Sequence, residues 1–162
     1  MNTIRKIASE ETFFLREMLY ESLFVPAGAE PFDQSIVEQP QIARYIQDWG
    51  QSPNDVAYVA VSLEGVLIGA IWGRTFAKEA PGYGFVDEHT PEIGMAVKQG
   101  YRGQGLGTQL IAEITQDYQN AGTQALSLSV HKQNKAKYLY EILGFETMRE
   151  SGDTLVMKKD LL

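Results

Sequence analysis

The chain contains no cysteine, so disulfides, thiolate metal sites and a cysteine nucleophile are all excluded. Histidine is scarce as well, since His89 and His131 are the only two, and no metal is implied. No apolar run is long enough for a transmembrane helix. The segment Met1–Lys6 lacks the apolar core of a secretory signal. These absences make a cytoplasmic location the default expectation, with no membrane partner.

Positive charge is also in short supply. The net charge is −7, which argues against nucleic acid as a partner. The few bases are unevenly placed, however, because residues 98–140 hold five Lys or Arg and only two Asp or Glu. A basic stretch in an acidic protein suits an anionic cofactor, although lysines that only solvate two helices would give the same pattern.

The length of 162 residues and the apolar content of 44% suit one domain over residues 1–162 with one sizeable core. Hydrophobic periodicity predicts the secondary structure. Strands are expected over 3–8, 56–61, 66–74, 92–97, 125–130, 145–149 and 154–159. Helices are expected over 10–24, 40–49, 106–121 and 134–143, with loops over 25–39 and 77–90. This order indicates a mixed α/β sheet flanked by helices.

Three local signals refine these boundaries. Ser9 is a plausible N-cap for the first helix. Glu64-Gly65 predicts a tight hairpin between two strands. Gly122 suits the position just beyond the end of the third helix.

A glycine-rich turn is the most informative feature that the chain does have. Residues 101–108 read Tyr-Arg-Gly-Gln-Gly-Leu-Gly-Thr, directly after the apolar run 93–97 and at the start of a helical pattern. Glycines remove the Cβ atoms that would keep a ligand away from the backbone. The helix that follows offers unpaired N–H groups and the positive end of its dipole. This combination predicts a site for phosphate or pyrophosphate.

Three phosphate-binding patterns compete for this turn. A dinucleotide fingerprint requires its third glycine one residue later, where Thr108 stands. A P-loop requires Gly-Lys-Ser/Thr, which occurs nowhere in the chain. The third pattern, Arg/Gln-x-x-Gly-x-Gly/Ala, is matched without a gap by residues 102–107. In this pattern the chain resembles the GNAT superfamily of acyl-CoA-dependent N-acetyltransferases.

A second block of sequence strengthens the resemblance. The alternating strand 125–130 is followed by Asn134, Ala136, Tyr140 and the ending Leu143-Gly144-Phe145, which resembles the second signature block of the same superfamily. Two blocks in the right order are much harder to obtain by chance than either alone. The resemblance implies the GNAT fold, a mostly antiparallel sheet of six to seven strands with about four flanking helices. It also implies transfer of an acetyl group from acetyl-CoA to an amine by direct attack in a ternary complex. A non-catalytic acyl-CoA-binding or regulatory module on the same fold is the alternative.

Two residues are expected to carry the chemistry. Glu92 begins the strand before the glycine turn, and alternation places it on one face with Gly94 and Ala96, which predicts open space in front of the carboxylate. In similar proteins a glutamate near this point often serves as general base, while the alternative is a solvated glutamate at a strand end. Tyr140 matches the tyrosine that donates to the leaving thiolate in the family, and its alternative is packing into the core. Tyr138 is expected to be such a packing residue, in phase with Leu139, Ile142 and Leu143.

The resemblance also implies a set of cofactor-binding residues. Asn134 looks like the asparagine that contacts the pantetheine arm, and it also suits a helix N-cap. The backbone of the preceding strand resembles the one that pairs with pantetheine, and the N–H of Met95 or Ala96 is implied as the oxyanion donor. The implied cofactor-binding residues are Met95, Ala96, Val97, Arg102, Gly103, Gln104, Gly105, Leu106, Gly107, Thr108 and Asn134.

The acceptor is less well defined by the sequence. Acidic and aromatic side chains gather on or beside the loop 77–90, namely Trp72, Tyr83, Phe85, Asp87 and Glu88. They suggest a positively charged primary amine held by carboxylates and aromatic faces, or only a solvated acidic loop. Polyamines, aminoglycosides, amino acids and peptide amines all remain open as acceptors. Dimers are common among similar proteins, so the resemblance allows a homodimer.

Overall fold

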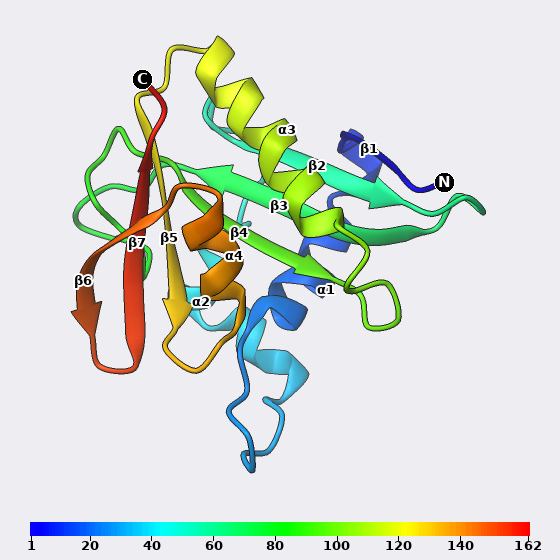
Figure 1. Cartoon of the computed structure of the whole chain (residues 1–162), viewed down its shortest axis with the longest axis horizontal. Helices are drawn as coiled ribbons and strands as arrows, with labels where there is room; N and C mark the ends of the chain where they lie inside the picture. The colour runs from blue at the N-terminus through cyan, green and yellow to red at the C-terminus, as the bar shows by residue number, and fades with distance from the viewer.

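The computed structural model describes residues 1–162, and a single twisted sheet runs through it (Figure 1). Seven strands lie in the order β1-β2-β3-β4-β5-β7-β6. Their bounds are β1 Thr3–Lys6, β2 Val56–Val61, β3 Leu67–Arg74, β4 Glu92–Val97, β5 Ala125–His131, β6 Glu146–Ser151 and β7 Thr154–Asp160. All neighbouring pairs are antiparallel except β4 and β5, which are parallel. The mixed sheet with flanking helices is the fold that the sequence predicts.

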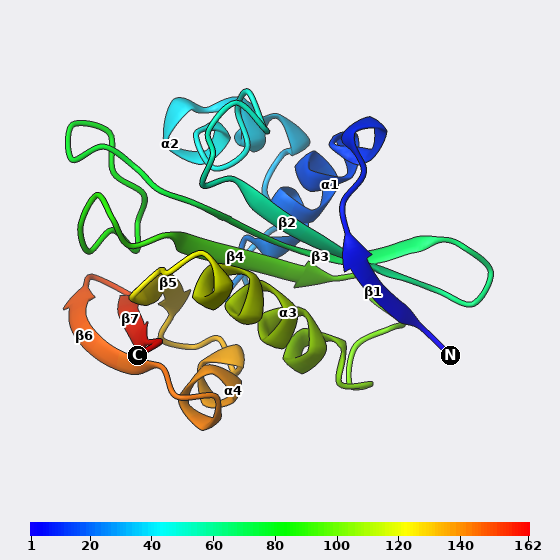
Figure 2. The same ribbon diagram turned by 90° about the horizontal axis from the view of Figure 1, so that it is seen from above.

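The helices cover both faces of the sheet, as Figure 2 shows. Helices α1 (Phe13–Ser22) and α2 (Pro40–Ala43) lie on one face, and α3 (Leu106–Asn120) and α4 (Ala136–Ile142) lie on the other. Two short 3₁₀ helices, η1 (Ser9–Glu11) and η2 (Gln34–Glu38), precede α1 and α2. None of the helices combines the length and hydropathy needed to cross a membrane.

A separate hydrophobic core lies on each face of the sheet. Along β2 the side chains alternate between the cores, as successive residues of a strand must. Ala57 and Val59 pack with the apolar side of α1, whereas Val56 and Ala60 pack beneath α3. The buried residues that α1 contributes are Phe14, Leu15, Met18 and Leu19, and those of α3 include Leu110, Ile111 and Ile114. Apolar packing on both faces fixes the central strands, including β4, on which the candidate site is built.

Two of the three local signals are confirmed. The turn at Glu64-Gly65 joins β2 and β3, with Gly65 at φ +84°. Gly122, at φ +83°, ends α3 in a Schellman motif, in which its N–H donates to Gln119 O and the N–H of Thr123 donates to Tyr118 O. The Ser9 prediction is wrong, because Ser9 lies inside η1 and the preceding amide of Ala8 donates to Glu11 Oε1 at 2.9 Å.

The second predicted helix is shorter than expected. It was expected over 40–49, yet regular helix ends at Ala43. Asp48 adopts left-handed backbone at φ +53°, which a helix through 49 does not allow, and the guanidinium of Arg74 on β3 donates to the carbonyls of Arg44 (2.9 Å) and Gln47 (2.7 Å) in the turns that replace the helix. Asp55 holds that guanidinium through bonds of 2.8 and 2.9 Å.

Candidate active site

The site begins where β4 and β5 separate. The two strands share one register pair, Glu92 with Ser127, and the amide of Ser127 donates to the carbonyl of Pro91 at 2.9 Å. Beyond that pair no ladder joins them, and a cleft of about 1300 Å³ opens between them. Peptide groups alternate in direction along a strand, so the N–H and C=O of Met95 face the gap while those of Ala96 face β3. The structure therefore presents the N–H of Met95, of the two implied oxyanion donors, to the cleft.

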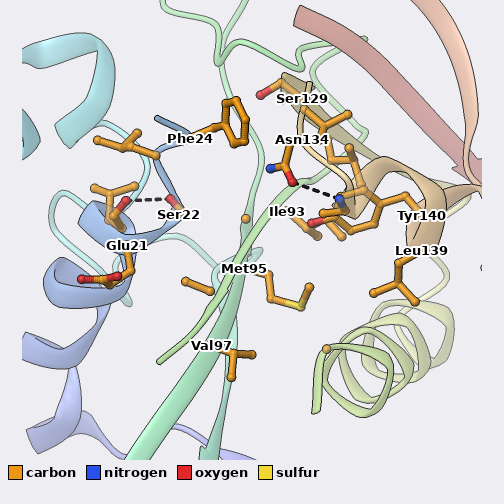
Figure 3. A pocket seen from close by; sticks show the side chains of 18 of the residues that line it. Glu21, Ser22, Phe24, Ile93, Met95, Val97, Ser129, Asn134, Leu139 and Tyr140 are labelled. Carbon is orange, nitrogen blue, oxygen red and sulfur yellow. Dashed lines mark hydrogen bonds between the residues drawn. The ribbon is translucent and has the colours of Figure 1, made fainter. Parts of the chain in front are cut away.

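Two walls face each other across this gap in Figure 3. Asn134, Leu139 and Tyr140 stand on one side, and Glu21, Ser22 and Phe24 stand on the other. Between the walls runs β4, whose side chains Ile93, Met95 and Val97 are drawn along its length. The cleft is thus long, and its ends differ in chemistry.

One end of the cleft is the glycine turn. Gly103 (φ +78°) and Gly105 (φ +81°) adopt left-handed backbone, and no atom of the chain lies within 4 Å of a Cβ built on either. Gly107 has another function, because its Cβ would lie 3.2 Å from Met95 Cε, so its absence lets α3 pack closely on β4. Gly105 is the N-cap of α3, no side chain caps this helix end, and its first turn carries no acidic residue. The bare amides of this turn fit a pyrophosphate.

Basic side chains surround the same end, but in this structure acidic residues of α1 pair with two of them. Lys98 Nζ lies 3.2 Å from Glu17 Oε2, and Arg102 lies 3.8 Å from Glu21 Oε2. Arg102 also donates through Nε to the carbonyl of Val97 at 2.9 Å. Lys135 lines the cleft on the opposite wall. These pairs are largely exposed, so they contribute little stability and their bases can turn to an anionic ligand.

Glu92 lies at the other end, and it is only 2% exposed. The Tyr45 hydroxyl donates to Glu92 Oε2 and accepts a 2.7 Å hydrogen bond from the Tyr83 amide. Glu92 Oε1 has no hydrogen-bond partner. Burial raises the pKa of Glu92 to about 7, against the opposing effects of Tyr45, of the nearby Gly84 amide and of the Arg149 charge. A carboxylate with this pKa and one free oxygen can accept a proton near neutral pH.

The expected open space in front of Glu92 is a wrong prediction. Trp72, the cross-strand partner of Gly94, covers that glycine so closely that a Cβ there would lie 2.6 Å from the indole Nε1. Gly82 comes equally close to the carboxylate, since a Cβ on it would collide with Glu92 and with Tyr45. The space at Gly82 and Gly94 is therefore filled by neighbouring side chains. A ligand can reach the Glu92 side chain only from the cleft that Glu92 lines.

Tyr140 lines the cleft from α4. Its ring packs edge-on against Phe145, with centroids 5.9 Å apart, and burial raises the pKa of its hydroxyl to about 12. The expected packing role of Tyr138 is wrong, because Tyr138 is 56% exposed and Ile142 is 82% exposed. Helix α4 is rotated so that Leu139 and Tyr140 pack against the core beneath α3.

Asn134 serves the start of α4, since its Oδ1 accepts from the Ala136 amide at 2.9 Å. The N-cap of α4 is Lys135, one residue later than the sequence predicts, although the Asn134 side chain still binds the first helical amide. Its Nδ2 points into the cleft in Figure 3 and is free to contact a ligand.

Four of the predicted site residues lie outside the cleft lining. Gln104 turns away and accepts from Asn2 at 3.2 Å. Phe85 packs against the core beneath α1. Asp87 accepts from the His89 amide at 2.8 Å, and Glu88 accepts from the Lys78 amide at 3.0 Å, so both carboxylates stabilise their own loop. The structure brings the remaining predicted residues to the cleft: Trp72, Tyr83, Glu92, Met95, Ala96, Val97, Arg102, Gly103, Gly105, Leu106, Gly107, Thr108, Asn134 and Tyr140.

Several lining residues were not identified from the sequence. Tyr45 is the most important of them, because its hydroxyl binds Glu92. The only sign of it in the sequence is that it lies on the second predicted helix, on the turn that follows the apolar Ile42. The wall after α1 is the other addition, formed by Leu23, Phe24 and Val25, with Ser22 at the end of the helix beside it. The Phe24 ring stacks on His131 with centroids 4.7 Å apart, which fixes this wall against the end of β5.

A sheet that opens between two parallel central strands, with a glycine turn and helix N-terminus at the opening, defines the GNAT fold. The sequence model described as the Acetyltransferase (GNAT) family matches residues 14–145. The chain belongs to this family. No curated protein matches the sequence.

Solved structures share the fold at low identity. PaiA N-acetyltransferase from Thermoplasma acidophilum, in complex with coenzyme A, is 21% identical, with 99% of each chain covered and a TM-score of 0.68. A GNAT-family acetyltransferase from Staphylococcus aureus Mu50 is 14% identical, with 100% of each chain covered and a TM-score of 0.72. The ribosomal-protein-S18-alanine N-acetyltransferase from Escherichia coli is 17% identical, with 99% of this chain and 94% of its own covered and a TM-score of 0.66. At these identities the likeness shows the fold alone.

Proposed function

We propose that this protein is an N-acetyltransferase that moves an acetyl group from acetyl-CoA to a primary amine by direct attack in a ternary complex. The observation that carries the proposal is the single cleft lined both by the glycine turn and by Glu92, whose buried Oε1 has no hydrogen-bond partner. An anion site and a proton acceptor at opposite ends of one cleft are what a phosphate-bearing acyl donor and an amine require.

The residues present fit coenzyme A. The amides bared at Gly103 and Gly105, with Arg102, would hold the pyrophosphate, and the free edge of β4 at Met95 with Asn134 would hold the pantetheine arm. Acetyl-CoA supplies the acetyl group as a thioester. The coenzyme A complex of PaiA N-acetyltransferase, which has the same fold, supports this assignment.

Glu92 acts in this proposal as the general base. An alkylammonium must lose a proton before its nitrogen can attack, and the Glu92 carboxylate, which lines the cleft, can accept that proton through a water. Its pKa of about 7 keeps it largely deprotonated in mildly alkaline solution while leaving it a usable base. The Tyr45 hydroxyl, fixed by the Tyr83 amide, orients the carboxylate by donating to Oε2.

Tyr140 acts as the general acid. Because burial raises the pKa of its hydroxyl to about 12, the group keeps its proton throughout the neutral range. It can therefore deliver that proton to a leaving group in the cleft, while the Met95 N–H supplies a donor for an oxyanion.

The direct test is thiol release. Purified protein mixed with acetyl-CoA and a panel of primary amines is expected to release free coenzyme A only when an amine is present. Binding of coenzyme A without thiol release for any amine would identify a non-catalytic acyl-CoA-binding module instead.

Tyr140→Phe is expected to lower kcat about 100-fold, because it removes the proton donor but keeps the ring against Phe145. The Kd for coenzyme A, measured by calorimetry, is expected to change less than about threefold. Tyr138→Phe, an exposed tyrosine of the same helix, is the control and should retain full activity. Equal loss of affinity and turnover in Tyr140→Phe would assign Tyr140 to packing or binding.

Tyr45→Phe is expected to shift the rise of kcat/KM with pH, which follows the deprotonation of Glu92, to higher pH. The Tyr45 hydrogen bond lowers the pKa of Glu92, so its removal raises that pKa further. Arg149 and the Gly84 amide, which also lower this pKa, stay in place in the variant. Activity should fall about tenfold at pH 7 and recover by pH 9. Tyr58→Phe removes another tyrosine hydroxyl bound to a carboxylate, Asp117 at 2.8 Å, away from the cleft, and should leave the profile unchanged. An equal loss at every pH would mean that Tyr45 contributes through packing alone.

A further inference from the structure

We infer that the acceptor is a monoamine with a compact apolar or aromatic body, whose ammonium nitrogen is held at Glu92 and whose body contacts the wall after α1. This inference rests on the proposed function and names the acceptor class of the same site.

The acceptor end of the cleft is built from apolar surface. On one side it is lined by Leu23, Phe24 and Val25, which follow α1, and on the other by Ile42, Tyr45 and Trp72. Tyr83 stands at the mouth, 52% exposed, although its backbone is tied to Tyr45. Such a lining stabilises a ligand by removing its apolar surface from water.

One charged side chain lines the cleft at this end, and the Arg149 guanidinium acts on it from outside the lining. The charged residues that line the cleft are Glu21, Glu92, Arg102 and Lys135. Glu21 and Arg102 pair with each other beside the glycine turn, and Lys135 belongs to the α4 wall. Glu92 is therefore the single carboxylate available to an ammonium deep in the acceptor end.

The acids of the neighbouring loop do not supply a second one. Asp87 and Glu88 accept hydrogen bonds from their own loop and lie outside the cleft lining. This differs from the expectation drawn from the sequence, in which these carboxylates surround the acceptor.

The polar atoms of the site that lack hydrogen-bond partners also favour an acceptor with one ammonium. Two buried side-chain atoms of the lining lack partners, Glu92 Oε1 and Trp72 Nε1. The first accepts hydrogen bonds and suits one ammonium, whereas the second only donates and would be repelled by another. A polyamine or an aminoglycoside would bring further cations into apolar surroundings without a counter-charge.

Hexylamine and 1,6-diaminohexane form a matched pair that tests this inference, because they differ by one ammonium at the same chain length. We expect kcat/KM with acetyl-CoA to be at least about tenfold higher for hexylamine and for 2-phenylethylamine than for 1,6-diaminohexane or spermidine. Equal or better use of the diamine, or of an aminoglycoside, would overturn the inference while leaving the proposed function intact.

Calorimetry on the protein saturated with coenzyme A separates acceptor selection from catalysis. Tighter binding of hexylamine than of 1,6-diaminohexane supports the inference even if no amine is acetylated, a result that would overturn only the proposed function. Equal or tighter binding of the diamine would overturn the inference.

Tyr83→Ala tests the position of the acceptor body. The KM for 2-phenylethylamine is expected to rise about fivefold or more, with the KM for acetyl-CoA unchanged, because the lost ring stands at the acceptor end. Tyr138→Ala removes a ring of nearly equal exposure (56% against 52%) outside the cleft, and it should change neither constant. An unchanged KM for the amine in Tyr83→Ala would place the acceptor body elsewhere.

Discussion

Glu92→Gln is expected to reduce kcat/KM at pH 8 by about 100-fold or more, the usual contribution of a general base. Glutamine has the same shape and can still accept from Tyr45, so the cleft should keep its form. The Kd for coenzyme A is expected to stay within about threefold of the wild type, because the glycine turn lies at the other end of the cleft. The residual activity should also lose the rise with pH that the wild type shows around pH 7.

The same substitution is expected to stabilise the protein in alkaline solution. Burial raises the pKa of Glu92 from 4.5 to about 7, so between these values the folded state retains a proton that the unfolded state releases. The free energy of unfolding therefore falls as the pH rises through this interval, and above it the buried charge costs up to roughly 3 kcal/mol. Removing the charge should raise Tm at pH 8 and have little effect at pH 4.5, as measured by thermal denaturation.

Loss of activity together with a higher Tm would separate catalysis from folding. Glu113→Gln, an exposed glutamate of α3, is the matched control and should change neither activity nor the pH dependence of Tm. Retained activity in Glu92→Gln would move the base to another group, and His131, which ends β5 beside Phe24, would be the next candidate to test.

The parts of the site that the sequence predicts depend on short stretches of chain. The left-handed glycines of the turn, the start of α3 directly after it and the Schellman end at Gly122 are all determined within about six residues. Backbone restrictions act locally, so such features are visible in the sequence itself. For the same reason the glycine turn and the second signature block are sufficient to indicate the GNAT fold.

The parts that the sequence does not predict depend on contacts between distant segments. Tyr45 and Glu92 are separated by 47 positions, and nothing in either stretch shows that they meet. Arg74 binds the carbonyl of Arg44, just after the second helix, from 30 positions away. In the sequence, the acids Asp87 and Glu88 resemble part of a ligand site, but in the structure each accepts a hydrogen bond from a backbone amide of its own loop. Composition cannot distinguish a carboxylate that is available to a ligand from one that already accepts hydrogen bonds from the protein backbone.

Gly105→Asp is expected to weaken binding of coenzyme A by about 100-fold or more. Aspartate tolerates the left-handed backbone better than most residues, and no atom of the chain lies within 4 Å of the new Cβ, so the fold should accept it. The side chain would instead project into the surroundings of the bare amides and set a carboxylate against the pyrophosphate. A 100-fold increase in Kd, measured by calorimetry, corresponds to about 2.7 kcal/mol.

Two further variants divide this effect into its causes. Gly105→Asn adds the same bulk without the charge, so a Kd between those of the wild type and Gly105→Asp would apportion the loss between steric exclusion and repulsion. Gly122→Asp places the same residue at the other end of α3, at φ +83° and also with open space around its Cβ, so it reproduces the backbone strain outside the cleft. Because strain is common to both positions, a Tm lowered equally in Gly105→Asp and Gly122→Asp with affinity lost only in the first would tie coenzyme A to this turn. Unchanged affinity in Gly105→Asp would mean that the pyrophosphate binds elsewhere, and the acyl-transfer proposal would lose its anion site.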